Sequence, residues 1–273
     1  MIRFFTGIFT FILVLVNALF VIFVVTPLGL LRFIPIKPFQ IFILRINEKF
    51  GELYLFFNSR LQDLMHKSKF EVHGQEKLKK DMWQFTTINH LSWADIFVYL
   101  YFCNYRQGVP RIFMKSQLWW LPITWTANLG LAMPFVVRRS KEAIKANPKL
   151  AETDKNATRR ACKMYQIMPT NVGGFIEGTR IDKQKYLASK SKFKNLMPPK
   201  IGGMGYTLEV MPYIDHLTDV TIVYKSDKRS FWNFLCGDLN EASVTINTYE
   251  IPKELRGVDY ADNDEMRDKL KSF

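Results

Sequence analysis

Residues 84–100 read QFTTINHLSWADIFVYL, and this stretch joins an expected strand to an expected helix. Residues 84–88 form a run of aromatic, β-branched and amide side chains, which is typical of a strand. Residues 96–100 are apolar, and Ser92 is suited to cap a helix that begins before them. The pattern therefore predicts a strand, a short loop and a helix over residues 92–104.

The loop carries a histidine that is followed five positions later by an aspartate. His90 is one of four histidines in the chain, and Asp95 is expected in the first helical turn, so the two side chains can meet. A carboxylate fixes the tautomer of a neutral imidazole and stabilises the imidazolium when the ring takes a proton from a hydroxyl. On spacing alone, such a pair is more often structural than catalytic.

From about residue 68 the chain alternates short apolar strands with helical segments. The expected strands are residues 84–88, 111–114, 131–137, 172–176, 219–224 and 243–251. The expected helices are residues 92–104, 117–128, 155–168, 203–211 and 263–271. This alternation predicts an α/β fold with a mostly parallel central sheet flanked by helices, formed by residues 68–273.

The N-terminal segment is strongly apolar. Residues 4–25 contain Thr6, Thr10 and Asn17 as their only polar side chains, and the segment is long enough to cross a hydrocarbon core of about 30 Å as a helix. A signal peptide is the alternative, but its apolar core usually has only about 7–15 residues and ends at a small-x-small cleavage site. We therefore expect an N-terminal membrane-anchoring helical segment.

A second apolar stretch, residues 28–44, is interrupted by prolines. This interruption favours a re-entrant or interfacial segment over a second clean span. From Ile46 to Leu64, apolar residues recur every three or four positions, which predicts a helix with a polar opposite face. That helix could dock on a soluble core or lie at a membrane interface. The expected anchor comprises residues 1–67.

The chain is strongly basic. Its 273 residues include 38 Lys and Arg against 25 Asp and Glu, a net charge of +13. This charge favours an anionic partner such as nucleic acid, a phospholipid surface or a phosphorylated metabolite. A hydrophobic content of 48% with 23 Phe argues against a disordered or purely nucleic-acid-coating protein. Three widely spaced cysteines fit neither a metal site nor a disulfide framework and are typical of a reducing compartment.

A second chemical cluster lies in residues 173–180, which read GGFIEGTR. Gly178 permits close backbone approach, and the backbone N–H groups of such a turn can face an anion. Arg180 offers a planar donor fork that matches phosphate oxygens. Glu177 could hold that guanidinium or accept a hydroxyl from a ligand. Taken alone, the tetrapeptide 177–180 is more often a tight turn with a local ion pair.

The two clusters together resemble the first and third motif blocks of the glycerolipid acyltransferases, the 1-acylglycerol-3-phosphate acyltransferase family. The first block, Asn-His-x-Ser-x-x-Asp, is matched by residues 89–95. The third block, Phe-Pro-Glu-Gly-Thr-Arg, is matched by residues 175–180, with Ile176 in place of the proline. The resemblance covers nearly all of residues 68–250.

Other blocks of the family are also similar. The second block, a Lys, a Pro and an apolar run ending in Arg, looks like Lys115, Pro122 and residues 132–138. The fourth block is matched loosely by residues 220–224. Residues 193–202 resemble the branch that contains lysocardiolipin acyltransferases and similar bacterial lysophospholipid acyltransferases.

The resemblance implies a membrane-bound enzyme that moves an acyl group from acyl-CoA or acyl-ACP to the hydroxyl of a lysophospholipid such as 1-acylglycerol-3-phosphate. It implies a general-base pair formed by His90 and Asp95. The residues implied in phosphate and glycerol binding are Glu177, Gly178, Thr179 and Arg180, with Lys115 and Arg138 as further anion contacts. The partners implied are the lysophospholipid, the thioester donor and membrane lipid, with no cofactor, metal or nucleic acid.

Three other functions remain as alternatives. They are a metal-dependent phosphoesterase, an acyltransferase with a cysteine nucleophile, and a non-catalytic membrane-anchored lipid-binding protein. The side of the membrane follows from charge, because Arg32, Lys37 and Arg45 after the first apolar stretch outnumber Arg3 and the α-amino group before it. The positive-inside rule then predicts a cytoplasmic catalytic domain, at the inner membrane if the protein is bacterial.

Overall fold

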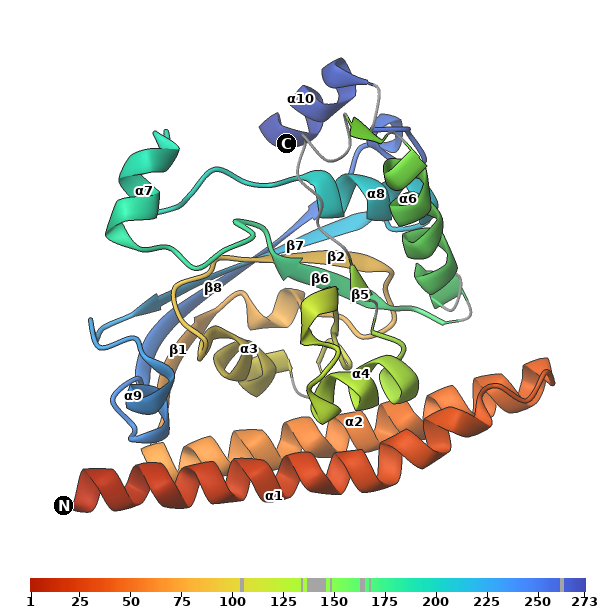
Figure 1. Ribbon diagram of the computed structural model, residues 1–273. Helices are drawn as coiled ribbons and strands as arrows, with labels where there is room; N and C mark the ends of the chain where they lie inside the picture. The colour runs from red at the N-terminus through yellow and green to blue at the C-terminus, as the bar shows by residue number, and fades with distance from the viewer. Residues whose placement is uncertain are drawn as a thin grey trace.

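The computed structural model describes residues 1–103, 106–133, 135–136, 146–147, 149–162, 165–166, 168–260 and 263–273 (Figure 1). Within these residues a six-stranded sheet has the order β1-β8-β7-β2-β6-β3. Its strands are β1 (Lys69–His73), β2 (Gln84–Ile88), β3 (Arg111–Ile112), β6 (Asn171–Phe175), β7 (His216–Tyr224) and β8 (Glu241–Glu250). Neighbouring strands are parallel except for β7 and β8. The predicted α/β fold with a mostly parallel sheet is confirmed.

Helices cover both faces of this sheet (Figure 1). They are α3 (Asp95–Cys103), α4 (Pro122–Leu131), α6 (Lys149–Cys162), α7 (Lys183–Ser189), α8 (Gly202–Val210), α9 (Phe231–Leu235) and α10 (Asp264–Ser272). Alternate residues of a strand point to opposite faces. Ile88 and Val220 therefore pack with α3 and α9, whereas Phe85 and Leu217 pack with α6, α8 and α10.

The pairing of β2 with β6 positions the loops that carry both sequence clusters. Ile88 lies opposite Phe175 in the parallel register, so the two strands end side by side. The side chain of Asn89 then continues the ladder to β7, because it donates to the carbonyl of Ile222 at 2.9 Å and accepts from its N–H at 2.8 Å. The segments after residues 89 and 175 consequently start at one edge of the sheet.

Helix α3 begins three residues later than predicted. Ser92 does not cap it; its hydroxyl accepts from the N–H of Ala94 at 3.0 Å and donates to the carbonyl of Arg229 at 2.7 Å. The carboxylate of Asp95 accepts from the N–H groups of Leu91 and Ser92 instead. These contacts hold residues 91–94 in a turn, and the helix starts at Asp95.

Several other helices and strands begin or end at residues that differ from the predicted ones. The predicted helix at 117–128 lies instead at Pro122–Leu131 after a short 3₁₀ turn (Ser116–Leu118), because proline is favoured in the first turn of a helix. The predicted strand at 131–137 was wrong at Leu131, which is the last residue of α4. Within that range the structure describes a strand at β5 (Phe135–Val136), which pairs with β4 (Met114–Lys115). The predicted helix at 155–168 starts earlier, at Lys149, and α6 ends at Cys162. β1, α7 and α9 were not predicted.

Two long N-terminal helices form a hairpin along one side of this body (Figure 1). They are α1 (Ile2–Leu31) and α2 (Lys37–His66). Within the described residues, α1 is the one helix that is long and apolar enough to cross a membrane. The second apolar stretch, residues 28–44, is not a separate segment, because it is divided between the end of α1, a turn and the start of α2.

Helix α1 contacts the body at both of its ends. Near its N-terminus, Arg3 pairs with Asp238 and donates to the side chain of Asn233 at 2.7 Å. Near its C-terminus, the hydroxyls of Thr26 and Thr126 lie 2.8 Å apart. A contact at each end fixes α1 lengthwise against the body.

Helix α2 buries polar side chains as well as Leu55 against the body and leaves other apolar side chains exposed on its outer face. Glu48 is buried, accepts from the N–H of Val109 at 3.0 Å and pairs with Arg111. The stripe from Ile46 to Leu64 stays partly or fully exposed; Leu64 is 75% exposed. Of this stripe, Phe50 packs against the cluster of Leu55, Val109 and Leu131, whereas Phe57 and Leu64 face away from the body.

The crossing of α1 and α4 is tight enough to require glycine. A Cβ atom added to Gly29 would lie 2.6 Å from the carbonyl oxygen of Leu129. We expect Gly29→Leu to destabilise the protein by roughly 1–3 kcal/mol, because backbone atoms cannot move aside as a flexible side chain can. Gly203→Ala is the control, since its added Cβ meets nothing within 4 Å. Thermal unfolding in detergent measures both, and equal midpoints would contradict the expectation.

Candidate active site

His90 and Asp95 meet at the start of α3. His90 Nδ1 lies 3.0 Å from Asp95 Oδ2. The Asp95 side chain is fully buried, and the His90 side chain is 12% exposed. The ring of His90 stacks on Phe175, with centroids 3.9 Å apart and planes 17° from parallel. The imidazole is thus held by one carboxylate and one aromatic face.

Four donors surround the carboxylate of Asp95. Besides His90, they are the N–H of Leu91 at 2.7 Å, the N–H of Ser92 at 2.8 Å and the hydroxyl of Tyr224 at 2.8 Å. Burial and the neighbouring carboxylate raise the pKa of Tyr224, so its hydroxyl remains a donor. With Asp95 acting only as an acceptor, His90 presents Nδ1–H to it, and Nε2 is the ring atom left for proton transfer.

The second sequence cluster lies directly beside His90. Gly178 has a φ of +71°, which favours glycine, and its N–H donates to the carbonyl of Phe175 at 2.9 Å. The N–H of Ile181 donates to the carbonyl of His90 at 2.9 Å. The backbone of the turn is therefore tied to the loop that carries the histidine.

Glu177 joins three segments of the site. Its side chain is buried and accepts from the N–H of His90 at 3.2 Å and from the N–H of Met197 at 3.3 Å. Burial raises the pKa of this carboxyl. The structure places Glu177 on these backbone groups, and the hydrogen bonds of its carboxylate do not involve Arg180. Its contact with a substrate stays a prediction.

Arg180 is exposed at the same place. Its guanidinium carbon lies 5.2 Å from the centroid of the Trp93 ring, and that ring lies 6.5 Å from the ring of His90. A cation over an aromatic face is attracted by the ring. The sequence clusters thus form one site, in which Trp93 lies next to both the imidazole and the guanidinium.

The two further predicted anion contacts are not placed. The backbone of Lys115 lies in β4, but its side chain is outside the described residues, as is all of Arg138. Both stay predictions.

Sequence reasoning missed three contributors to the site. Tyr224 ends β7 and falls in the loosely matched fourth block, so its position gave a weak signal. Trp93 lies between the matched positions of the first block, where the family pattern leaves the residue open. The N–H of Met197 is a backbone group, and no side-chain pattern marks it.

The cysteines are poorly suited to act as nucleophiles. Cys103, Cys162 and Cys236 are all buried. Burial raises the pKa of all three thiols, that of Cys162 to about 12. A thiolate is the reactive form, so this environment disfavours the cysteine mechanism.

Comparison with known proteins gives the class of the chain. A family model described as Acyltransferase matches residues 69–225, and the chain belongs to this acyltransferase family. Among solved structures, it is similar to the crystal structure of the 1-acyl-sn-glycerophosphate (LPA) acyltransferase PlsC from Thermotoga maritima. The identity is 16%, the TM-score is 0.46, and the match covers 98% of this chain and 93% of that one. No curated protein matches the sequence.

The surroundings of Asp95 predict the effect of an amide there. In Asp95→Asn one oxygen becomes an NH₂ group, which must face a donor and can no longer hold Nδ1–H in place. We expect acyl transfer to fall by roughly a hundred- to ten-thousandfold, together with some loss of stability from the unsatisfied NH₂ group. Tyr224→Phe, which removes a single donor, should lower the rate far less. Steady-state rates of both variants test this, and similar losses would argue against a special role for the carboxylate.

The raised pKa of Glu177 predicts a pH-dependent stability. Its ordinary value is near 4.5. Between that value and the higher folded-state pKa, the folded protein binds more protons than the unfolded chain, so stability falls as the pH rises through this window. Glu177→Gln should lack this contribution. We expect the difference in unfolding free energy between the two proteins to change across the window and to be constant above it. A constant difference at every pH would contradict this.

Proposed function

We propose that the chain is a membrane-bound lysophospholipid acyltransferase. It transfers an acyl group from an acyl thioester, acyl-CoA or acyl-ACP, to the hydroxyl of a lysophospholipid such as 1-acylglycerol-3-phosphate, and it needs no cofactor. Membership of the acyltransferase family supports the reaction class. The motif resemblance supports the choice of acceptor.

One observation carries the proposal. The imidazole of His90, held by Asp95 at 3.0 Å, shares its site with the exposed guanidinium of Arg180. A base next to a cation suits an acceptor that carries both a hydroxyl and a phosphate. The guanidinium fork matches phosphate oxygens, and Nε2 of the ring can accept the proton of the hydroxyl.

In the proposed reaction, His90 Nε2 removes the proton of the acceptor hydroxyl as its oxygen forms a bond to the thioester carbonyl carbon. Asp95 stabilises the imidazolium that results. The carbon–sulfur bond of the tetrahedral intermediate then breaks, and the leaving thiolate takes the proton from His90. The products are the acylated phospholipid and the free thiol. Gly178 and Thr179 complete the turn that places Arg180 for the phosphate of the acceptor.

The hairpin supports attachment to a membrane. Large apolar side chains on the outer faces of α1 and α2 are exposed, among them Phe23 at 74% and Phe42 at 56%. Because α1 contacts the body at both ends, we propose that it lies along the membrane surface and does not leave the body as an upright span. The charges around the first apolar stretch favour the cytoplasmic face.

A single substitution tests the chemistry. His90→Ala should lower acyl transfer at least about a hundredfold, because a positioned general base contributes roughly 10²–10⁴ to the rate. The same variant should float with phospholipid vesicles as the unchanged protein does, because residue 90 lies on the loop before α3 and not on the hairpin. Near-normal transfer in this variant would refute the general-base assignment.

The assay should vary both substrates. Labelled acyl-CoA and acyl-ACP are each offered with lysophospholipids of different head groups, in the presence and absence of a chelator. Transfer to at least one acceptor is expected. No transfer from either donor, with lipid binding retained, would favour the non-catalytic lipid-binding alternative.

A further inference from the structure

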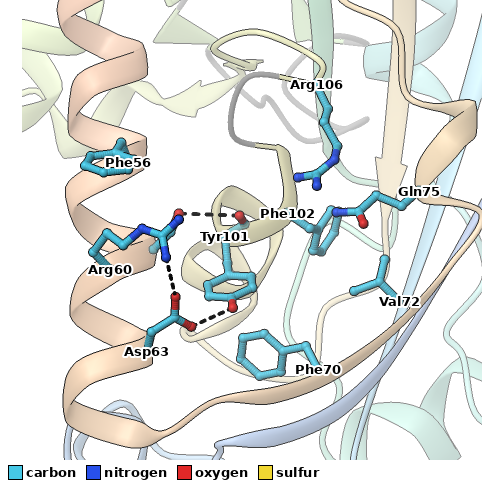
Figure 2. Close-up of a pocket in the computed structure, with 10 residues that line it drawn as sticks. Phe56, Arg60, Asp63, Phe70, Val72, Gln75, Tyr101, Phe102 and Arg106 are labelled. Carbon is cyan, nitrogen blue, oxygen red and sulfur yellow. Dashed lines mark hydrogen bonds and ion pairs between the residues drawn. The ribbon is translucent and has the colours of Figure 1, made fainter.

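A cavity of about 740 Å³ lies between α2, β1 and α3, away from His90 (Figure 2). Asp95 begins α3, whereas Tyr101 and Phe102, which line the cavity, lie near its other end. At a rise of 1.5 Å per residue, the two positions are separated by about 9 Å along the helix. The cavity also lies at β1, which β8 and β7 separate from β2 in the sheet. The proposed reaction gives this cavity no role.

Much of the lining is aromatic. The rings of Phe70 and Tyr101 meet edge to face with centroids 4.9 Å apart. Phe56 supports the guanidinium of Arg60, whose carbon lies 5.3 Å from the ring centroid. Phe102 borders the cavity but is only 1% exposed, so Phe70 and Tyr101 supply the accessible rings. These surfaces favour contact with carbon-rich groups of a ligand.

Two arginines and one aspartate supply the charge of the lining. Asp63 accepts from the hydroxyl of Tyr101 at 2.6 Å and from Arg60 at 3.5 Å. Arg106 makes no side-chain hydrogen bond or ion pair with any residue that the structure describes. Figure 2 shows Arg60 on α2 and Arg106 beyond the end of α3, on either side of Tyr101 in this view. The lining therefore has one positive charge in excess and donors available from two sides.

The mouth of the cavity adjoins the outer face of the hairpin. Arg60 is exposed on α2, three residues after Phe57 and four before Leu64. Residues three and four apart are neighbours on a helix surface. Phe57 and Leu64 are 46% and 75% exposed. The apolar surface proposed to meet the membrane thus continues to the edge of the cavity.

We propose that this cavity is a second, non-catalytic lipid site that binds an anionic phospholipid. Its phosphate lies between the guanidiniums of Arg60 and Arg106, and its glycerol and first acyl carbons lie against Phe70 and Tyr101. Guanidinium forks match phosphate oxygens. A phospholipid fits better than a free anion because the lining is as aromatic as it is charged and borders the apolar face of α2. The inference rests on the proposed membrane contact and not on the acyl-transfer chemistry.

Native mass spectrometry of the full chain in a neutral detergent tests this site. The protein is titrated with dioctanoyl phosphatidylglycerol and, separately, with dioctanoyl phosphatidylcholine. We expect tighter retention of the anionic lipid. Arg60→Gln with Arg106→Gln should weaken its binding by about tenfold or more, because hydrogen bonds to charged groups are among the stronger ones. Both side chains are exposed, so the double variant should fold, which thermal unfolding checks.

A matched control removes two cations at the far end of the body. Lys253→Gln with Arg267→Gln changes α10 and the turn packed against it, away from the hairpin (Figure 1). This control should bind the anionic lipid as the unchanged protein does.

Three results would overturn the proposal. They are equal retention of both lipids, unchanged binding in the Arg60 and Arg106 variant, and displacement of the lipid by equimolar inorganic phosphate, which would indicate a free-anion site. Absence of acyl transfer in the unchanged protein would refute the proposed reaction but would leave this binding result standing.

Discussion

The parallel register of β2 with β6 determines the geometry of the candidate active site. Ile88 lies opposite Phe175, so His90 and Glu177 each follow the end of their strand by two residues. That equal offset brings the N–H of His90 to the carboxylate of Glu177. A slip of one residue would turn every side chain of a strand to the opposite face and would separate these groups. The site therefore depends on the sheet more than on either loop alone.

The second constraint is the buried carboxylate of Asp95, which joins three parts of the fold. It receives the imidazole and two backbone N–H groups from the loop before α3, and the hydroxyl of Tyr224 from the end of β7. A buried carboxylate is costly unless donors satisfy it. The same four contacts that stabilise the charge also orient the ring of His90. The contacts that fold this loop therefore also determine the orientation of the imidazole ring.

The sequence predicted the parts of the fold with strong side-chain patterns and missed those without them. The strand at 84–88 and the meeting of His90 with Asp95 followed from the side-chain pattern and the spacing, whereas the association of the two motifs was implied by the family resemblance. β1, α7 and α9 were missed because each is short, between five and seven residues. Periodicity showed that α2 has an apolar and a polar face, but it could not show which face meets the body. The contact of Met197 with Glu177 is a backbone contact that pairs residues 20 apart, and only tertiary folding determines it.

The orientation of α2 is understandable if an apolar phase covers the hairpin. The ion pair between Glu48 and Arg111 is buried, and such pairs add little net stability because both charges lose water. By contrast, exposed side chains such as Phe42 and Leu64 would each contribute roughly 1.5–3 kcal/mol if they were removed from water. In water alone, leaving these side chains exposed forgoes that contribution. The proposed contact of the outer face with lipid would supply it, and it would bring the cavity beside Arg60 to the same surface.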